Sequence, residues 1–151
     1  DGVVKIIFFA MLETDLIDVM KQSMAIFCTD GLAVSPYGDY KDVKVHPRYY
    51  GAFPRILGRY VRQKKVLALE DAIYKMTLLP AMKMNLKDRG FIGEGYKADI
   101  TIFDKNTIVD KSTFNHPHQY PLGVKHVIVN GELVVENHEH TGKLPGEIIL
   151  R

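Results

Sequence analysis

An acidic residue at the end of an apolar run is the first candidate for chemistry in this sequence. Residues 24–28 are apolar, and Thr29, Asp30 and Gly31 follow them directly. A carboxylate at the carboxyl end of a buried parallel strand lies where α/β folds place their active sites. There it could act as a general base, provided that a partner holds its charge. The alternative is an Asp-Gly turn in which Asp30 accepts backbone hydrogen bonds.

A histidine and an arginine follow in the next loop, as His46-Pro47-Arg48. His46 could be a metal ligand or carry a proton, and Arg48 could bind a carboxylate through two parallel hydrogen bonds. Both residues are therefore candidates for binding a substrate. The alternative is a turn histidine and a surface arginine.

Two further pairs of histidines lie near the carboxyl end of the chain. His116 and His118 would point the same way in an extended segment and could bind a metal, but Pro117 separates them and no third ligand stands at a useful spacing. We therefore interpret them, like His138 and His140, as parts of structured loops. Cys28 is interpreted as a small apolar core residue.

The elements that must position Asp30 and Arg48 follow an α/β rhythm. The apolar stretches 3–10 and 24–28 are predicted to be strands buried on both faces, with a helix between them. Residues 32–52 are predicted to form a long loop that carries four tyrosines. Helical periodicity returns at 56–61 and at 69–76.

The character of the sequence changes after Gly90. Residues 98–104 alternate as a strand does, and residues 124–137 are predicted to form two strands around Asn130-Gly131, a strong hairpin signal. A last short strand is predicted at 146–151. Residues 1–88 are thus expected to be α/β and residues 89–151 all-β. Two parallel strands cannot form a covered sheet, and the β part holds too few strands for a sandwich, so each half is expected to belong to something larger.

Composition narrows the class of protein. The 151 residues are 46% hydrophobic and 25% charged, with a formal net charge of +2. There is no polybasic run and no apolar stretch long enough for a bilayer, so neither a nucleic acid nor a membrane is expected as a partner. The single cysteine, Cys28, fits a reducing cytoplasm. Asp1 rather than methionine begins the chain, so we expect a fragment or a processed product.

A set of motifs gives the chain a family resemblance. They are TDG (29–31), HPRYYGAFPRILGRYVRQ (46–63), LEDAIYKMTLLPA (69–81), DRGFIGEGYKADITIFD (88–104), PHQYPLGVKHVIVNGELVVEN (117–137) and HTGKLPGEIILR (140–151). In this order the motifs closely resemble the carboxyl-terminal part of the N-acyl-D-amino-acid deacylases, or D-aminoacylases, of the amidohydrolase superfamily. The stretch 79–104 resembles many amidohydrolases, and the stretch 46–62 narrows the resemblance to the deacylase branch.

The resemblance implies a fold and a set of roles. The fold would be the carboxyl-terminal part of a (β/α)8 barrel, with its last two strands and following helices in residues 1–88. Residues 89–151 would be the carboxyl-terminal share of a small β-sandwich. Asp30 matches the general acid/base that acts beside a zinc-bound water, and Arg48 looks like the arginine that holds the α-carboxylate of the substrate. No segment corresponds to the zinc ligands of the family, so this chain alone is expected to lack the metal site and to be inactive.

Two classes of function remain open at this stage. The first is the carboxyl-terminal part of a zinc-dependent hydrolase that cleaves N-acyl-D-amino acids to a D-amino acid and a carboxylate, with a hydantoinase-like cyclic amidase as the runner-up within the enzymes. Arg48 argues against the cyclic amidase, because a ring substrate has no free α-carboxylate. The second is a non-catalytic structural or assembly module. If the 151 residues fold alone, the uncovered apolar strands are expected either to drive self-association or to leave the first ~25 residues rearranged relative to the family fold.

Overall fold

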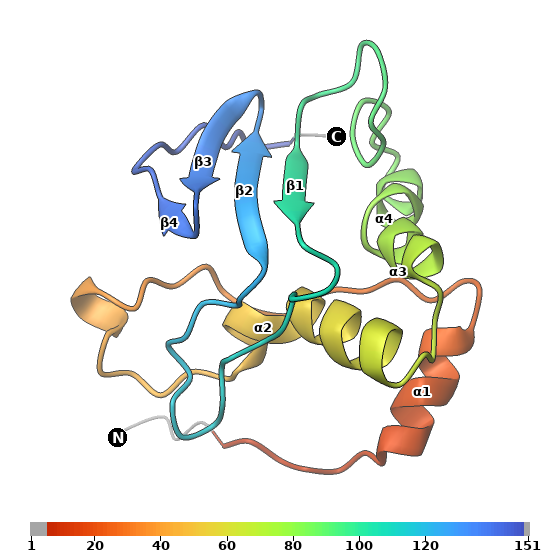
Figure 1. Ribbon diagram of the computed structural model, residues 1–151, viewed down its shortest axis with the longest axis vertical. Helices are drawn as coiled ribbons and strands as arrows, with labels where there is room; N and C mark the ends of the chain where they lie inside the picture. The colour runs from red at the N-terminus through yellow and green to blue at the C-terminus, as the bar shows by residue number, and fades with distance from the viewer. Residues whose placement is uncertain (1–5, 150–151) are drawn as a thin grey trace.

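A computed structural model describes residues 6–149 of the chain (Figure 1). The described residues divide into a helical part followed by a sheet. The helices are α1 (Glu13–Lys21), the 3-10 turn η1 (Gly38–Tyr40), α2 (Arg48–Arg55), the π-helix η2 (Ile56–Gln63), α3 (Leu69–Met76) and α4 (Leu78–Lys83). The strands are β1 (Ile100–Phe103), β2 (Val124–Val129), β3 (Glu132–Glu136) and β4 (Glu139–His140).

The four strands form one antiparallel sheet in the order β1-β2-β3-β4. The turn between β2 and β3 is Asn130-Gly131, and both residues have positive φ angles, 48° and 82°. Positive φ at both central positions matches the right-handed twist of the flanking strands, which is why Asn-Gly is favoured there. The predicted hairpin is therefore confirmed.

The turn of this hairpin is held by the segment that precedes β1. Arg89, whose side chain is only 12% exposed, forms ion pairs with Asp99 and Glu147. Its Nη2 also donates to Oδ1 of Asn130 at 2.9 Å. Arg89 thus ties the hairpin turn to residues near both ends of the sheet region.

The core lies where the helices meet the loop between β1 and β2. In Figure 1, α2 and η2 form one continuous rod beneath the sheet, with α3 and α4 beside it. Ile108 from the loop is 2% exposed and packs with buried residues of α1, η2 and α3. Gly58 of η2 allows this approach, because a Cβ there would lie 2.7 Å from the carbonyl oxygen of Ile108. The buried residues of this core are Met20, Ile56, Leu57, Tyr60, Ala72 and Ile108.

Three predicted strands differ from the structure. Residues 24–28 form no strand, and neither do residues 6–10 of the predicted strand 3–10 or residues 146–149 of the predicted strand 146–151. The other residues of the last two segments lie outside the described part. A strand needs the hydrogen-bonding groups of a neighbouring strand, and within residues 6–149 no ladder partner lies beside these segments. Their sequences suit a sheet, but the described chain supplies no sheet for them.

The missing ladder leaves large apolar side chains in contact with solvent. Ile6, Phe8 and Phe9 are 78%, 81% and 78% exposed, and Met24 is 77% exposed. Cys28, predicted to be a core residue, is also exposed. The prediction for Cys28 was wrong because it assumed that residues 24–28 form a buried strand.

Candidate functional site

The structure brings Asp30 and Arg48 together. Oδ2 of Asp30 lies 2.8 Å from Nη2 of Arg48, and the two side chains are 78% and 41% exposed. Eighteen positions separate the residues along the chain, so the loop between them folds back to close the pair. The sequence pointed to both residues, but their direct contact is a finding of the structure.

The backbone around Asp30 is held in an unusual conformation. Asp30 has a φ of 45°, in the left-handed region, which aspartate tolerates better than most residues. The next residue, Gly31, donates its N–H to Oγ1 of Thr29 at 3.2 Å. A Cβ on Gly31 would lie 3.0 Å from Cα of Tyr49, so the absence of a side chain lets the chain pass against the start of α2. Asp30 therefore lies in a segment without helix or strand, and not at the end of a strand as the sequence predicted.

Helix α2 begins at Arg48, and His46 caps that end of the helix. Nδ1 of His46 accepts a hydrogen bond from the backbone N–H of Arg48 at 3.0 Å. The first N–H groups of a helix have no partner within the helix, so this bond stabilises its start. Burial of the ring and the charge of Arg48 lower the pKa of His46 from its ordinary value, although Asp30 opposes them. The neutral form is the one that can accept this bond.

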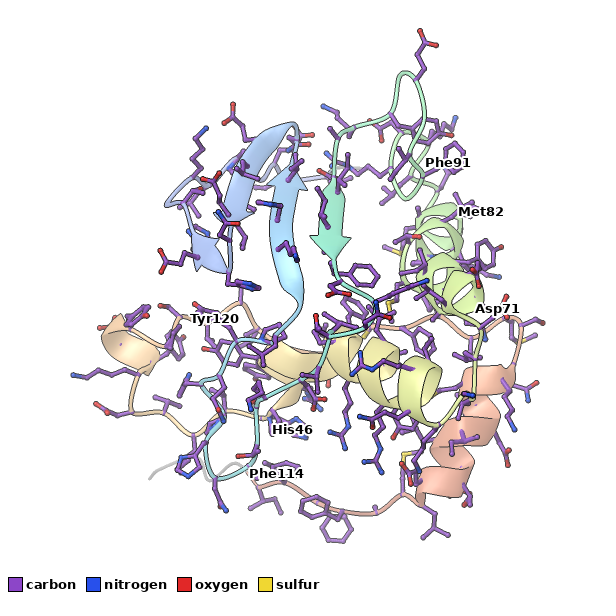
Figure 2. All side chains as sticks on the ribbon, in the orientation of Figure 1. His46, Asp71, Met82, Phe91, Phe114 and Tyr120 are labelled. Atoms are coloured by element: carbon purple, nitrogen blue, oxygen red, sulfur yellow. The ribbon has the colours of Figure 1, made fainter. Side chains whose placement is uncertain are left out.

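Arg48 and His46 also line a pocket of about 660 Å³. Apolar side chains contribute much of its wall, among them Phe9, Leu12 and Phe114. The rings of His46 and Phe114 meet edge to face at 5.2 Å (Figure 2). Nε of Arg48 is buried and has no hydrogen-bond partner within the described residues. A buried donor without a partner is costly, but Nε has almost no solvent-accessible surface, so a ligand can reach only the exposed N–H groups of Arg48.

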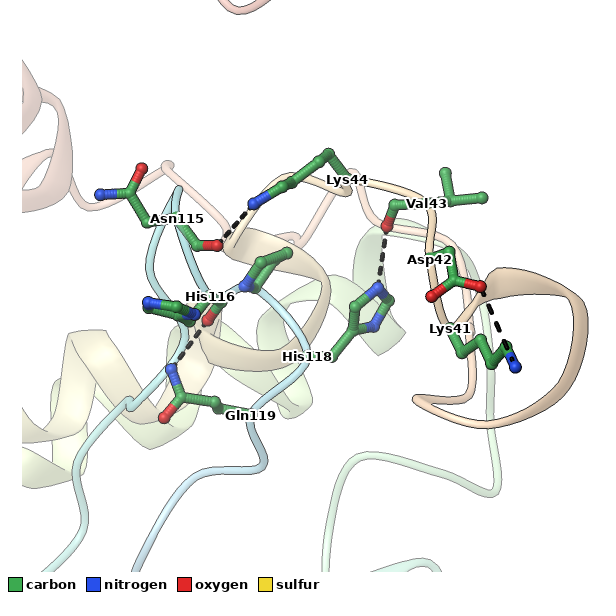
Figure 3. A pocket seen from close by; sticks show the side chains of 9 residues that line it. Lys41, Asp42, Val43, Lys44, Asn115, His116, His118 and Gln119 are labelled. Atoms are coloured by element: carbon green, nitrogen blue, oxygen red, sulfur yellow. Dashed lines mark hydrogen bonds and ion pairs between the residues drawn. The ribbon is translucent and has the colours of Figure 1, made fainter.

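The second half of the long loop is tied to the loop that carries the histidine pair His116 and His118 (Figure 3). His118 Nε2 lies 2.8 Å from the carbonyl oxygen of Val43, and Lys44 Nζ donates to the carbonyl oxygen of Asn115 at 2.7 Å. His118 Nδ1 lies 2.9 Å from the hydroxyl of Tyr50, a residue of α2. His118 therefore fastens the loop that joins Asp30 to Arg48. The sequence predicted a loop over residues 32–52, but residues 48–52 belong to α2, so Tyr50 lies in a helix. The four tyrosines of this stretch were the only sequence signal for the contact with His118.

The remaining residues give no metal centre by themselves. Among residues 6–149 there is no group of three or more histidine, cysteine, aspartate or glutamate side chains placed to hold a metal ion. His140 uses Nδ1 to accept the N–H of Gly142 at 2.9 Å. Within the described part of the chain no helix is long and apolar enough to cross a membrane.

Arg48 thus lines a pocket with apolar walls and also pairs with Asp30, which lies outside the pocket lining. Comparison with known proteins identifies the family. Residues 29–135, more than half of the chain, match the family described as "Amidohydrolase family". The chain belongs to the amidohydrolase family.

The relatives that match nearly the whole chain are named as deacylases or an aminoacylase, and two dihydroorotases match 46–47% of it. The chain is 38% identical over 145 residues to N-acyl-D-glutamate deacylase from Alcaligenes xylosoxydans xylosoxydans. The matched region covers 96% of this chain and 28% of the relative. The crystal structure of D-aminoacylase superposes with a TM-score of 0.80 and 38% identity, over 88% of this chain and 27% of that one. N-acyl-D-glutamate deacylase from Bordetella bronchiseptica, complexed with zinc and a phosphonate inhibitor, gives a TM-score of 0.76 and 36% identity over 83% and 25% of the two chains. This chain thus spans little more than a quarter of the length of these relatives.

Proposed function

We propose that this chain is the carboxyl-terminal part of a zinc-dependent hydrolase that cleaves N-acyl-D-amino acids to a D-amino acid and a carboxylate. The relatives over nearly the whole chain carry deacylase names, which supports the substrate class. In this proposal residues 1–88 belong to the end of a (β/α)8 barrel and residues 89–151 to a β-sandwich. The segments 6–10 and 24–28, which lack a ladder, would pair with barrel strands outside this chain. The single cysteine leads us to place the protein in the cytoplasm.

The ion pair between Asp30 and Arg48 is the observation that carries the proposal. Arg48 would bind the α-carboxylate of the substrate through two of its guanidinium N–H groups, one of them on the Nη2 that now contacts Asp30. Two parallel bonds of this kind fix the plane of the carboxylate and thereby orient the scissile amide. A substrate carboxylate that takes over Nη2 also releases Asp30. The freed carboxylate can then take a proton from the attacking water and return it to the leaving amine.

The residues present do not fit a zinc site of their own. The described chain offers no set of three ligands, and the cation of Arg48 lies directly beside the Asp30 carboxylate. Metal ligands would therefore come from the part of the relatives' length that this chain does not span.

A non-catalytic assembly module is the second candidate function. The exposed apolar side chains of residues 6–12 favour it, because a surface of this kind recruits partners or a second copy of the chain. Self-association of the 151 residues through this segment is part of that proposal. A cyclic amidase remains the other enzymatic alternative, because two dihydroorotases match about half of the chain. Hydrolysis of N-acyl-D-amino acids without opening of cyclic amides would exclude it.

An active protein that contains this chain provides the test. It is either the natural polypeptide or D-aminoacylase in which the matching 28% of the sequence is replaced by this chain. We expect hydrolysis of N-acyl-D-amino acids but not of their L enantiomers. Arg48→Lys should raise KM by a factor that corresponds to roughly 1.5–3 kcal/mol, because a bidentate pair is lost. Asp30→Asn should lower kcat with little change in KM.

The matched comparison uses a substrate in which the α-carboxylate is replaced by a neutral amide. The wild-type protein should turn it over poorly, and Arg48→Lys should change its KM little. Equal turnover of both substrates by the wild type would show that Arg48 does not bind the α-carboxylate of the substrate. A protein that binds zinc and still hydrolyses neither substrate would favour the assembly module.

A further inference from the structure

Lys75 of α3 is a buried cation that the proposed mechanism does not use. The residue is 5% exposed. Its Nζ donates to the carbonyl oxygen of Met20 at 2.6 Å and to that of Gln22 at 2.5 Å. Its own carbonyl oxygen accepts the N–H of Phe27 at 3.1 Å. One residue of α3 therefore makes three hydrogen bonds to the segment 20–27.

These bonds lie where the chain leaves α1. The last carbonyl groups of a helix have no partner within the helix, and a cation near them is favoured by the helix dipole. Lys75 supplies both a donor and a charge to that end. A buried ammonium group is costly unless hydrogen bonds satisfy it, so the two carbonyl oxygens and the ammonium stabilise one another.

The same bonds fix the start of the segment that ends in Asp30. Residues 22–29 have no ladder partner within the described chain. Phe27, bonded to the backbone of Lys75 and packed against the core, is three residues before Asp30. On the other side, Gly31 is packed against Tyr49 at the start of α2. Asp30 thus lies between two fixed points of the chain: Phe27, bonded to the backbone of Lys75, and Gly31, packed beside Tyr49.

We propose that Lys75 is a positioning residue for Asp30. It acts on the reaction only through the backbone of residues 20–27, which sets where the Asp30 carboxylate stands. This inference rests on the proposed role of Asp30 in the deacylase reaction. Displacement of a reacting group by about 1 Å can cost about 100-fold in rate, so loss of the attachment should be visible in kcat.

The experiment replaces Lys75 by methionine in the active protein that contains this chain. Lys75→Met keeps most of the stem and the backbone bond to Phe27, and it removes only the side-chain bonds to Met20 and Gln22. We expect kcat to fall about 100-fold while KM stays within about two-fold, because Arg48 keeps its place on α2. Combined with Asp30→Asn, the same replacement should have no further effect on kcat. Lys83→Met, at an exposed lysine of the neighbouring helix α4, is the matched control and should leave both constants unchanged.

Hydrogen exchange of a peptide covering residues 22–31 gives a second readout that does not depend on activity. Lys75→Met should speed exchange there about ten-fold, and Lys83→Met should not. If Lys75→Met does not fold, Lys75→Gln replaces it in the test, because glutamine keeps an uncharged hydrogen-bond donor. We expect Lys75→Gln to lower kcat about ten-fold, and to have no effect on kcat when Asp30→Asn is also present.

The possible outcomes separate the two proposals. Equal losses of kcat with and without Asp30 would overturn the positioning role and leave a purely structural lysine. Unchanged exchange of residues 22–31 in Lys75→Met would overturn it as well. If the unaltered protein hydrolyses no N-acyl-D-amino acid, the proposed function fails. Faster exchange in Lys75→Met would then still show that Lys75 holds the segment.

Discussion

Two stretches of this chain are equally suited to β-structure, and only one of them forms it. Residues 124–136 make the hairpin of β2 and β3, while residues 24–28 make no strand. Each strand of the hairpin has its pairing partner close by in the sequence, because a two-residue turn brings β3 alongside β2. The other stretch follows a helix, and its partner would have to come from elsewhere. An apolar sequence therefore shows that a segment can form a strand. Whether the segment does form one depends on whether a partner strand lies beside it.

The same contrast appears in burial. Val134 of β3 is 9% exposed and Ile108, in the loop between β1 and β2, is 2% exposed, whereas Phe8 is 81% exposed. The free energy of unfolding of this chain should therefore depend strongly on buried residues such as Ile108 and Val134, and hardly at all on the apolar residues before α1.

The largest effect is expected at Ile108. Ile108→Ala should lower the free energy of unfolding by about 2–5 kcal/mol, because it leaves a cavity where the helices meet the loop. Urea denaturation followed by circular dichroism measures the loss. Ile108→Val, which removes one methylene, should cost only about 0.5–1.5 kcal/mol. Equal stability of the alanine variant and the unaltered chain would contradict the contrast in burial.

A smaller loss is expected at Gly123, just before β2. Its φ is 87°, and a Cβ there would lie 2.6 Å from the backbone of Ile108. Gly123→Ala should cost about 2–3 kcal/mol, because strain and overlap with backbone atoms add. Gly131→Ala is the control that isolates the strain. Its φ is 82° with no atom near the added Cβ, so the cost should be about 1 kcal/mol. Equal losses in the two variants would mean that the close approach at Gly123 contributes nothing.

The attachment of α1 should depend on pH. Glu13 binds Lys64 at 2.6 Å and Arg59 at 2.8 Å, and these hydrogen bonds lower its pKa from 4.5 to about 2. Between pH 4.5 and 2, Glu13 binds a proton more readily in the unfolded chain than in the folded one. The stability that its carboxylate contributes is therefore present above pH 4.5 and is lost as the pH falls toward 2. Glu13→Gln should flatten the pH dependence of the unfolding free energy in this window.

The control for Glu13 is Glu94→Gln, at an exposed position of the loop before β1. It should leave the slope between pH 2 and 4.5 as it is. A slope that Glu13→Gln does not change would show that the ion pairs with α1 do not form in solution.

The smallest effect on stability is expected at Phe8. Phe8→Ser should change the free energy of unfolding by less than about 0.5 kcal/mol, because the ring is already in solvent. It should nevertheless reduce self-association, which sedimentation velocity at rising concentration measures. Leu144→Ser, at a residue that is 85% exposed near the carboxyl end, is the matched control and should not reduce it. A monomeric unaltered chain would contradict this prediction.

The sequence predicted the elements whose determinants are local. The hairpin around Asn130-Gly131 and the helix at 69–76 follow from turn chemistry and periodicity, and both are present. The strands at 24–28 and 146–149 failed because their partners are not set by local pattern. Asp30 and Arg48 were singled out by residue type, and their roles stay predictions, but the ion pair between them depends on the path of the loop.

Two of the contacts that sequence reasoning missed are distant in sequence. Tyr50 and His118 are 68 positions apart, and Lys75 is 55 positions from Met20. A lysine in an amphipathic helix has the same local pattern whether its amine reaches solvent or the end of another helix. Only the packing of α3 against α1 distinguishes the two cases.

The hairpin turn also bears on how the protein ages. An asparagine followed by glycine loses its amide when the next backbone nitrogen attacks the side-chain carbonyl carbon and a succinimide forms. Here the N–H of Gly131 is bonded to the carbonyl oxygen of Ala98 at 3.0 Å, and Nδ2 of Asn130 is bonded to that of Pro145 at 2.8 Å. Arg89 holds the other side of the same amide. Folding therefore protects Asn130 from deamidation, and the conversion of this asparagine to isoaspartate would record the time that a molecule has spent unfolded.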